Sequence, residues 1–202
     1  MIALVGLITF LIVNRWYGTT NGATTAPNVA DGAETSPSSN VTFFYVAEDG
    51  MGLIGIEQEA PYGADTLTRA RVIAERQLSD APAPLMSPFP EGTRLRSIYL
   101  AADGNAFVDL SREVTTFHSG GSLDELFTVY ALVNALTMNV PEIRAVQIMI
   151  EGREVDTLAG HIDLRQPLEP NMQWVVDPDN PDDSEPSSAV GSPLEHSLSR
   201  ST

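Results

Sequence analysis

The sequence contains no cysteine. This absence excludes disulfide bonds, thiolate metal sites, cysteine nucleophiles and a lipid-modified N-terminal cysteine. Lysine is absent too, so the eleven basic residues other than histidine are all arginines, and the formal net charge is −16. A chain this acidic is repelled by nucleic-acid phosphates and by anionic lipid headgroups, so neither class is expected as a partner.

The chain starts with an uninterrupted apolar run, Met1–Val13. The run is shorter than the roughly 20 residues of a spanning helix and fits the roughly 7–15 residues of a signal-peptide core, although no Arg or Lys precedes it. Arg15, Trp16 and Tyr17 then resemble a membrane-interface belt. We interpret residues 1–17 as a membrane anchor or signal-type segment, either retained or cleaved; a buried core helix is the alternative.

Two polar segments flank the part that has enough apolar residues to fold. Residues 18–40 are mostly Thr, Ser, Gly, Ala, Asn and Pro, and residues 177–202 are rich in Pro, Ser and acidic residues. Such compositions bury too little apolar surface to pack, so we predict a flexible linker and a disordered acidic tail. Residues 41–176 are predicted to form a single folded domain.

The first half of this domain is predicted to contain two strands and a helix. Val41–Ala47 is β-branched and aromatic, and Leu53–Ala60 is a weaker strand. Asp65 is placed to cap a helix over Thr66–Leu78, whose apolar residues fall on one face. Asp80–Pro90 contains four prolines, which predicts an irregular loop, with Met86 and Phe89 exposed on it.

A β-hairpin is predicted over Glu91–Ser111. Two runs of strand-forming residues flank Asp103-Gly104, a pair typical of the type I′ turn, in which both central residues have positive φ. The second helix is predicted to start at Ser122, in a capping box with Glu125, and to reach about Met138. It is apolar around much of its girth, which indicates deep burial or a partner-binding face.

A further strand is predicted at Ile143–Ile150, followed by a turn at Glu151-Gly152 and a return over Val155–Leu158. Gly160–Leu168 is a closing segment that ends near Trp174–Val176. The element order β-β-α-β-β-α-β-β predicts the α+β class, with a mixed β-sheet and two helices packed on one face.

Several motifs are weighed as possible sites. Gly50–Gly55 matches G-x-G-x-x-G, but an extended segment follows where a dinucleotide site needs a helix, so turn and strand glycines are predicted. His118, His161 and His196 have no carboxylate or second His at helical ligand spacing, so no zinc site is predicted.

Two further features, each containing carboxylates, are also interpreted as having no catalytic or metal-binding role. Asp109 and Ser111 share a strand face, but the nucleophile elbow is absent, so both are expected to hydrogen-bond nearby backbone. Asp177–Glu185 lacks the calcium-loop pattern. The sequence therefore predicts no catalytic, metal or cofactor-binding residue.

The order of features resembles the sporulation and spore germination (GerMN) domain family over about Val41–Leu168. The residues that carry the resemblance are Pro90–Leu95 with the form P-x-G-T-x-L, Val108–Ser111, Thr137, Val146–Gly152, Gly160–Leu164 and Pro167-Leu168. The resemblance implies an extracytoplasmic domain, tethered to the cell membrane, with no assigned catalytic residues. Members of the family often carry a lipobox cysteine, which this chain lacks.

The resemblance implies a non-enzymatic structural or protein-interaction module in a sporulation, germination or cell-envelope assembly, acting through a protein partner or self-association. The alternative function is an extracytoplasmic solute- or cell-wall-binding domain, with its groove beside Asp80–Pro90.

Overall fold

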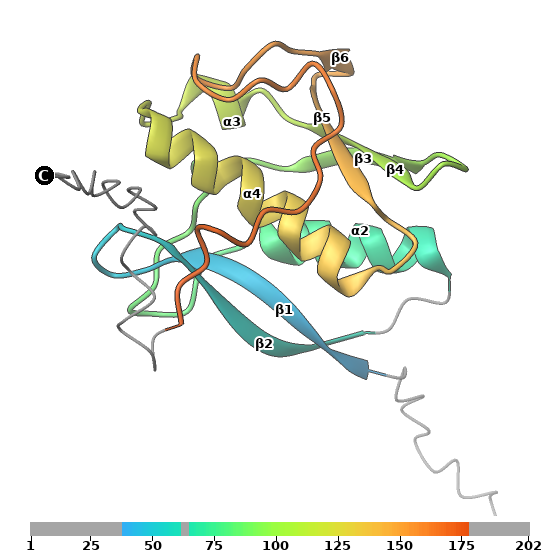
Figure 1. Ribbon diagram of the computed structural model, residues 1–202, viewed down its shortest axis with the longest axis horizontal. Helices are drawn as coiled ribbons and strands as arrows, with labels where there is room; N and C mark the ends of the chain where they lie inside the picture. Colours follow the sequence, from blue (N-terminus) through green and yellow to red (C-terminus); the bar gives the residue numbers. More distant parts are fainter. Residues whose placement is uncertain (1–37, 62–64, 178–202) are drawn as a thin grey trace, which may run out of the picture. The chain divides into compact units, whose positions relative to one another are not determined.

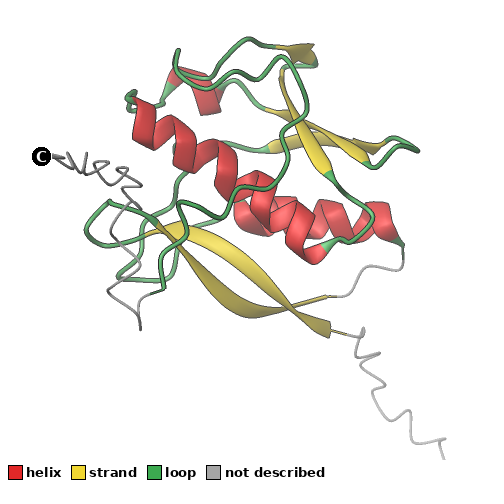
Figure 2. Cartoon of the chain, in the orientation of Figure 1, coloured by secondary structure: helices red, strands yellow, loops and turns green. Residues whose placement is uncertain are grey.

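The folded part consists of helices with β-sheet on both sides (Figures 1 and 2). The structure is a computed structural model that describes residues 38–61 and 65–177. The predicted anchor or signal-type segment, most of the predicted linker and nearly all of the predicted acidic tail lie outside these residues. Within them, no helix combines the length and apolarity needed to cross a bilayer.

The first sheet is a two-stranded antiparallel hairpin. β1 (Ser38–Val46) pairs with β2 (Leu53–Pro61) along its whole length. β1 begins three residues before the predicted start at Val41. Its aromatic residues Phe43, Phe44 and Tyr45 are buried, as expected for strand-forming side chains that pack against a core.

The second sheet is mixed, with strand order β3-β4-β5-β6. β3 (Leu95–Leu100) and β4 (Asn105–Leu110) are antiparallel, β4 and β5 (Ala145–Ile150) are parallel, and β6 (Arg153–Glu154) returns against β5. The α+β class and the predicted element order are confirmed. The strands divide between two sheets, where the sequence analysis predicted one.

The predicted type I′ geometry is absent from the first of two predicted turns, at Asp103-Gly104, and two successive positive φ angles occur at the second, Glu151-Gly152. Gly104 has φ 90°, but it is the only residue of Asp103-Gly104 with positive φ. Ala101 accepts from Gly104 and donates to Asn105, so the loop is a three-residue turn and the type I′ prediction is wrong there. Glu151 and Gly152 both have positive φ and join paired strands. The predicted return at Val155–Leu158 is also wrong, because the pairing is complete by Glu154.

α2 (Thr66–Gln77) begins where the sequence predicts. The Asp65 side chain accepts from the backbone N–H of Thr68 at 2.9 Å and from the Thr68 hydroxyl at 2.8 Å. These hydrogen bonds hold the pKa of Asp65 below its usual value. α2 packs against α4 (Ser122–Asn139) and β3.

Replacing Asp65 with alanine should lower the thermal unfolding midpoint by a few degrees, because the first turn of α2 loses its cap. The pKa of Asp65 is lowered in the folded state, so its contribution is complete above the ordinary aspartate pKa and is lost as pH falls below it. Differential scanning calorimetry from pH 7 to pH 3 measures both effects. Asp80→Ala, at an exposed position just beyond the same helix, is the matched control and should change little.

α4 is buried on most of its circumference. The buried residues are Glu125, Phe127, Thr128, Val129 and the run Ala131–Leu136. One side of the helix contacts β1 and another contacts β5, so α4 lies between the two sheets (Figure 1). Deep burial therefore accounts for the apolar residues around most of the circumference of α4. A four-residue helix that the sequence analysis did not predict, α3 (Glu113–Thr116), precedes α4.

The outer edge of β1 is closed by side chains from both long helices. Gln77 accepts from the N–H of Phe44 at 2.9 Å and donates to its carbonyl at 2.7 Å. Asn139 accepts from the N–H of Thr42 at 2.9 Å and donates to the carbonyl of Thr42 at 2.8 Å. Met86 pairs with Val46 through two backbone bonds. From Thr42 to Val46 the outward backbone groups of this edge are therefore bound and cannot pair with another strand.

Candidate functional site

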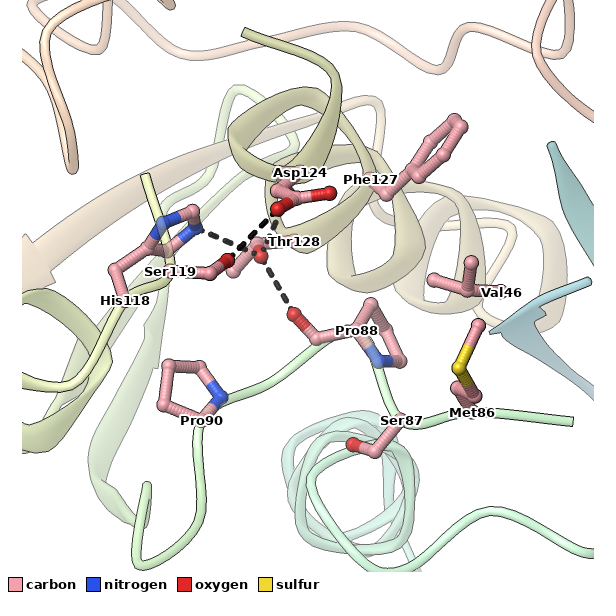
Figure 3. A pocket seen from close by; sticks show the side chains of 10 residues that line it. All are labelled: Val46, Met86, Ser87, Pro88, Pro90, His118, Ser119, Asp124, Phe127 and Thr128. Atoms are coloured by element: carbon pink, nitrogen blue, oxygen red, sulfur yellow. Dashed lines mark hydrogen bonds between the residues drawn. The ribbon is translucent and has the colours of Figure 1, made fainter. Parts of the chain in front are cut away.

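The best-formed pocket lies between the proline-rich loop and the start of α4 (Figure 3). Its volume is about 170 Å³. The lining residues are Val46, Met86, Ser87, Pro88, Pro90, His118, Ser119, Asp124, Phe127 and Thr128. The sequence analysis placed its alternative binding groove beside this loop, and Met86 is 46% exposed as predicted. Phe89 is only 7% exposed, so that part of the prediction is wrong: its ring belongs to the core.

His118 is held in the pocket wall by a chain of hydrogen bonds. The backbone N–H of Gly120 donates to its Nδ1 at 3.0 Å, which leaves the proton of a neutral ring on Nε2. Nε2 lies 3.1 Å from the Thr128 hydroxyl, and that hydroxyl donates to the Pro88 carbonyl at 2.6 Å. Both ring nitrogens are occupied, so the imidazole fixes the loop to the helix and has no free lone pair to act as a base.

Asp124 is the acidic group of the pocket. It is exposed at the start of α4, and its Oδ2 accepts from the Ser119 hydroxyl at 2.8 Å. The rest of the lining is largely prolines, Met86 and Phe127 (Figure 3). The pocket therefore offers a small, mostly apolar surface with a single carboxylate at its rim.

Replacing Thr128 with valine should reduce the free energy of unfolding by about 1–2 kcal/mol, because the Pro88 carbonyl loses its donor and His118 loses its acceptor. Urea denaturation measures this change. Ser119→Ala removes an exposed hydroxyl from the same pocket and should change stability by about 0.5 kcal/mol or less. Equal effects of the two substitutions would contradict the assignment of Thr128 as the residue that holds the loop.

Glu125 is a fully buried carboxylate at the base of α4. It accepts from the backbone N–H groups of Leu158 and His161, both at 2.7 Å, and its Oε2 lies 3.1 Å from His161 Nδ1. Burial raises the pKa of Glu125, but the N–H groups of Ala159, His161 and Leu158 outweigh burial, so the pKa lies below the usual glutamate value. The result is a carboxylate that anchors the 158–161 loop.

This arrangement corrects the predicted capping box. α4 starts at Ser122 as predicted, but its N-cap is Gly121 and not Ser122, and no side chain caps it. Ser122 is already inside the helix, so Glu125 turns toward the loop. The sequence analysis gave His161 no carboxylate partner, and the fold supplies one from 36 residues away.

Asp109 and Ser111 bind backbone, as predicted. Asp109 accepts from the Gly152 N–H at 2.7 Å and from Arg96 at 2.8 Å, and Ser111 accepts from the Arg94 N–H at 3.0 Å. Neither has a histidine beside it among the hydrogen bonds of the described residues.

The glycine motif lies in a turn and a strand, as predicted. Gly50 has φ 72° in the β1–β2 turn, and Gly55 lies in β2 opposite Phe44. No three acidic or histidine side chains of the described residues are grouped so that they could hold a metal ion. The structure does not describe His196. Of the segment Asp177–Glu185, it describes only Asp177.

Comparison with known proteins gives one family. Residues 42–156, more than half of the chain, match the family described as Germane: Sporulation and spore germination. No curated protein matches the sequence.

Three solved structures are similar. The tandem GerMN domains of the sporulation protein GerM from Bacillus subtilis align at 17% identity with a TM-score of 0.52, over 68% of this chain and 47% of that one. This chain thus spans about half of the tandem protein. The first GerMN domain of the same protein gives 16% identity, a TM-score of 0.46 and coverage of 70% and 99%. A candidate lipoprotein from Clostridium perfringens aligns at 18% identity with a TM-score of 0.47, over 65% of this chain and 87% of that one. The likeness to the tandem structure shows the fold.

Proposed function

Because this chain belongs to the Germane family of sporulation and spore germination domains, we propose that it is a non-enzymatic protein-interaction module of an extracytoplasmic assembly. In this proposal it binds a protein partner or a second copy of itself, and residues 1–17 attach it to the cell membrane. The apolar run Met1–Val13 supports the attachment, and the family supports a setting in sporulation, germination or the cell envelope.

The observation that carries the proposal is that the potentially reactive side chains form hydrogen bonds that hold loops and strand ends in place. Glu125 and His161 hold one loop, and His118 holds another. Asp109 and Ser111 join strand ends. A catalytic site needs polar groups that converge on a space for substrate, whereas these groups are bound to backbone and to each other.

Two measurements on the full chain test the proposal. Fractionation of cells should place the chain with the membranes, and a Leu7→Asp, Phe10→Asp variant should move to the soluble fraction, because charges interrupt the apolar run. Light scattering in a mild detergent, with chemical cross-linking in intact cells, should detect an oligomer or a defined complex. A monomer at every concentration with no cross-linked product would contradict the proposal.

A second function rests on the pocket beside the proline-rich loop. Its volume of about 170 Å³ and its apolar lining fit a group the size of a few carbon atoms, such as part of a cell-wall fragment. A thermal-shift screen of soluble wall fragments tests it. A raised unfolding midpoint that the Met86→Ala variant abolishes would favour solute binding over a protein partner.

A further inference from the structure

The outer edge of β2 is open along half of its length. The backbone N–H and C=O groups of successive strand residues point to opposite edges of a hairpin. Val46 and Leu53 lie directly opposite each other, and the groups of both point outward. Those of Val46 bind Met86, and those of Leu53 bind Trp174 and Val176. The same alternation directs the N–H and C=O groups of Gly55, Glu57 and Glu59 outward from β2. None of these groups has a hydrogen-bond partner among residues 38–61 and 65–177.

The adjoining part of this edge already accepts a strand. Leu53 donates to Trp174 at 2.8 Å and accepts from Val176 at 2.8 Å, which is one rung of a parallel ladder. The next rung would need an N–H from residue 178 to reach the Gly55 carbonyl. Residue 178 is proline, which has no N–H to donate to that carbonyl.

Other edges of the described strands are partly bound or irregular. The β1 edge is bound from Thr42 to Val46 by Gln77, Asn139 and Met86. β3 has an irregular register between Leu95 and Ser97, a feature that keeps an edge strand from pairing. The open stretch of β2 instead has three successive outward residues, Gly55, Glu57 and Glu59, without a backbone partner among the described residues. Open edges of this kind serve elsewhere as sites where an extended peptide adds a strand.

The side chains along the open stretch define what can pair with it. Glu57 and Glu59 are exposed on one face; one oxygen of each is bound, by Asn40 and Ser38 respectively, and the other has no partner among the described residues. On the opposite face Ile54 and Ile56 are half-buried. An added strand would meet carboxylates on one face and partly covered apolar surface on the other.

We propose that Gly55–Glu59 of β2 binds an extended segment of a partner protein in which arginine or lysine alternates with apolar residues. A second copy of this chain is a poor occupant, because it would bring its own Glu57 and Glu59 and a net charge of −16. The inference rests on the proposed function and names the surface and the partner chemistry.

The test uses a synthetic heptapeptide of alternating arginine and valine with the full chain in a non-ionic detergent. Amide hydrogen exchange, measured by NMR, should slow by about tenfold or more at Gly55, Glu57 and Glu59, because added-strand hydrogen bonds protect these groups. The same peptide N-methylated at alternate residues keeps its charge but loses its donors, and it should protect none of the three. A peptide of alternating glutamate and valine should not bind.

Two variants assign the effect to the edge. Glu57→Pro removes an outward N–H that no strand of the fold uses, and it should weaken binding by about tenfold. The double variant Glu57→Arg, Glu59→Arg keeps the backbone donors and should prefer the glutamate peptide. Unchanged exchange at millimolar arginine peptide, or equal protection by the N-methylated peptide, would overturn the proposal.

Failure here is separable from failure of the proposed function. If cross-linking in cells gives the same complex with wild type and with Glu57→Pro, the complex uses another face, and the inference about β2 is wrong while the proposed function stands. If wild type gives no complex at all, the proposed function itself fails.

Discussion

Truncation of Glu125 to alanine should reduce the free energy of unfolding by about 3–5 kcal/mol. The carboxylate is fully buried and accepts from the backbone of Leu158 and of His161 and from the His161 ring. Alanine leaves buried donors without an acceptor and a void at the base of α4. The 158–161 loop should then lose the hydrogen bonds that fix it.

Urea denaturation of the wild type and the variant measures this loss. Asp124→Ala is the matched control, since Asp124 precedes Glu125 on the same helix but is exposed, and it should change stability by about 0.5 kcal/mol or less. Glu125→Gln should be intermediate, because its amide oxygen still accepts while its NH₂ group faces a donor. A loss below about 1 kcal/mol for Glu125→Ala would contradict the anchoring role.

The same carboxylate predicts a pH dependence. Its pKa is lower in the folded state than the ordinary value of 4.5, so its contribution is complete above that value and declines as pH falls toward the folded-state pKa. The stability difference between wild type and Glu125→Gln should be constant from pH 6 to 7 and should narrow in acid. A difference that grows as the pH falls would contradict the sign of the shift.

Replacing Gln77 with leucine should reduce the free energy of unfolding by about 3–4 kcal/mol, although leucine is apolar and the site is buried. The Gln77 amide satisfies both backbone groups of Phe44, at 2.9 and 2.7 Å, and no water can replace it while the residue stays fully buried. Leucine would leave a buried N–H and a buried carbonyl unpaired. Amide exchange at Phe44 should rise together with the loss of stability.

Gln173→Leu is the control for this substitution, because Gln173 is exposed and its side chain makes no hydrogen bond in the described structure. Asn139→Ala should cost less than Gln77→Leu, since Asn139 and Thr42 are only half-buried. A Gln77→Leu protein as stable as wild type would mean that the β1 edge can be satisfied without the amide.

Local signals predicted those features of the fold that local chemistry determines. Asp65 caps α2 because its side chain reaches a backbone N–H three residues away, and the aromatic run of β1 is buried wherever the strand packs. The Ser122–Glu125 motif failed for the opposite reason. A capping box gives modest stabilisation, and a set of buried loop N–H groups competes for the same carboxylate.

Long-range partners could not be read from the sequence. Gln77 and Phe44 are 33 residues apart, and Asn139 and Thr42 are 97 apart. Their pairing depends on how the helices pack across the hairpin, and no spacing rule encodes it. The division into two sheets likewise depends on long-range packing, and the sequence analysis missed it. The open β2 edge was hidden in the same way, because it depends on which β2 residue pairs with Trp174 and Val176, more than 110 residues away.

The most direct test of the central claim is the phenotype of a chain in which the two described histidines and the serine of the Asp109–Ser111 pair are replaced. The native gene would be replaced by one encoding His118→Gln, His161→Asn and Ser111→Ala together, and the cellular level of the variant would be checked by immunoblot. If the chain acts by binding, the variant at normal level should restore whatever function is lost on deletion of the gene. A variant that accumulates normally, stays in the membrane fraction and behaves as the deletion does would contradict a non-enzymatic role.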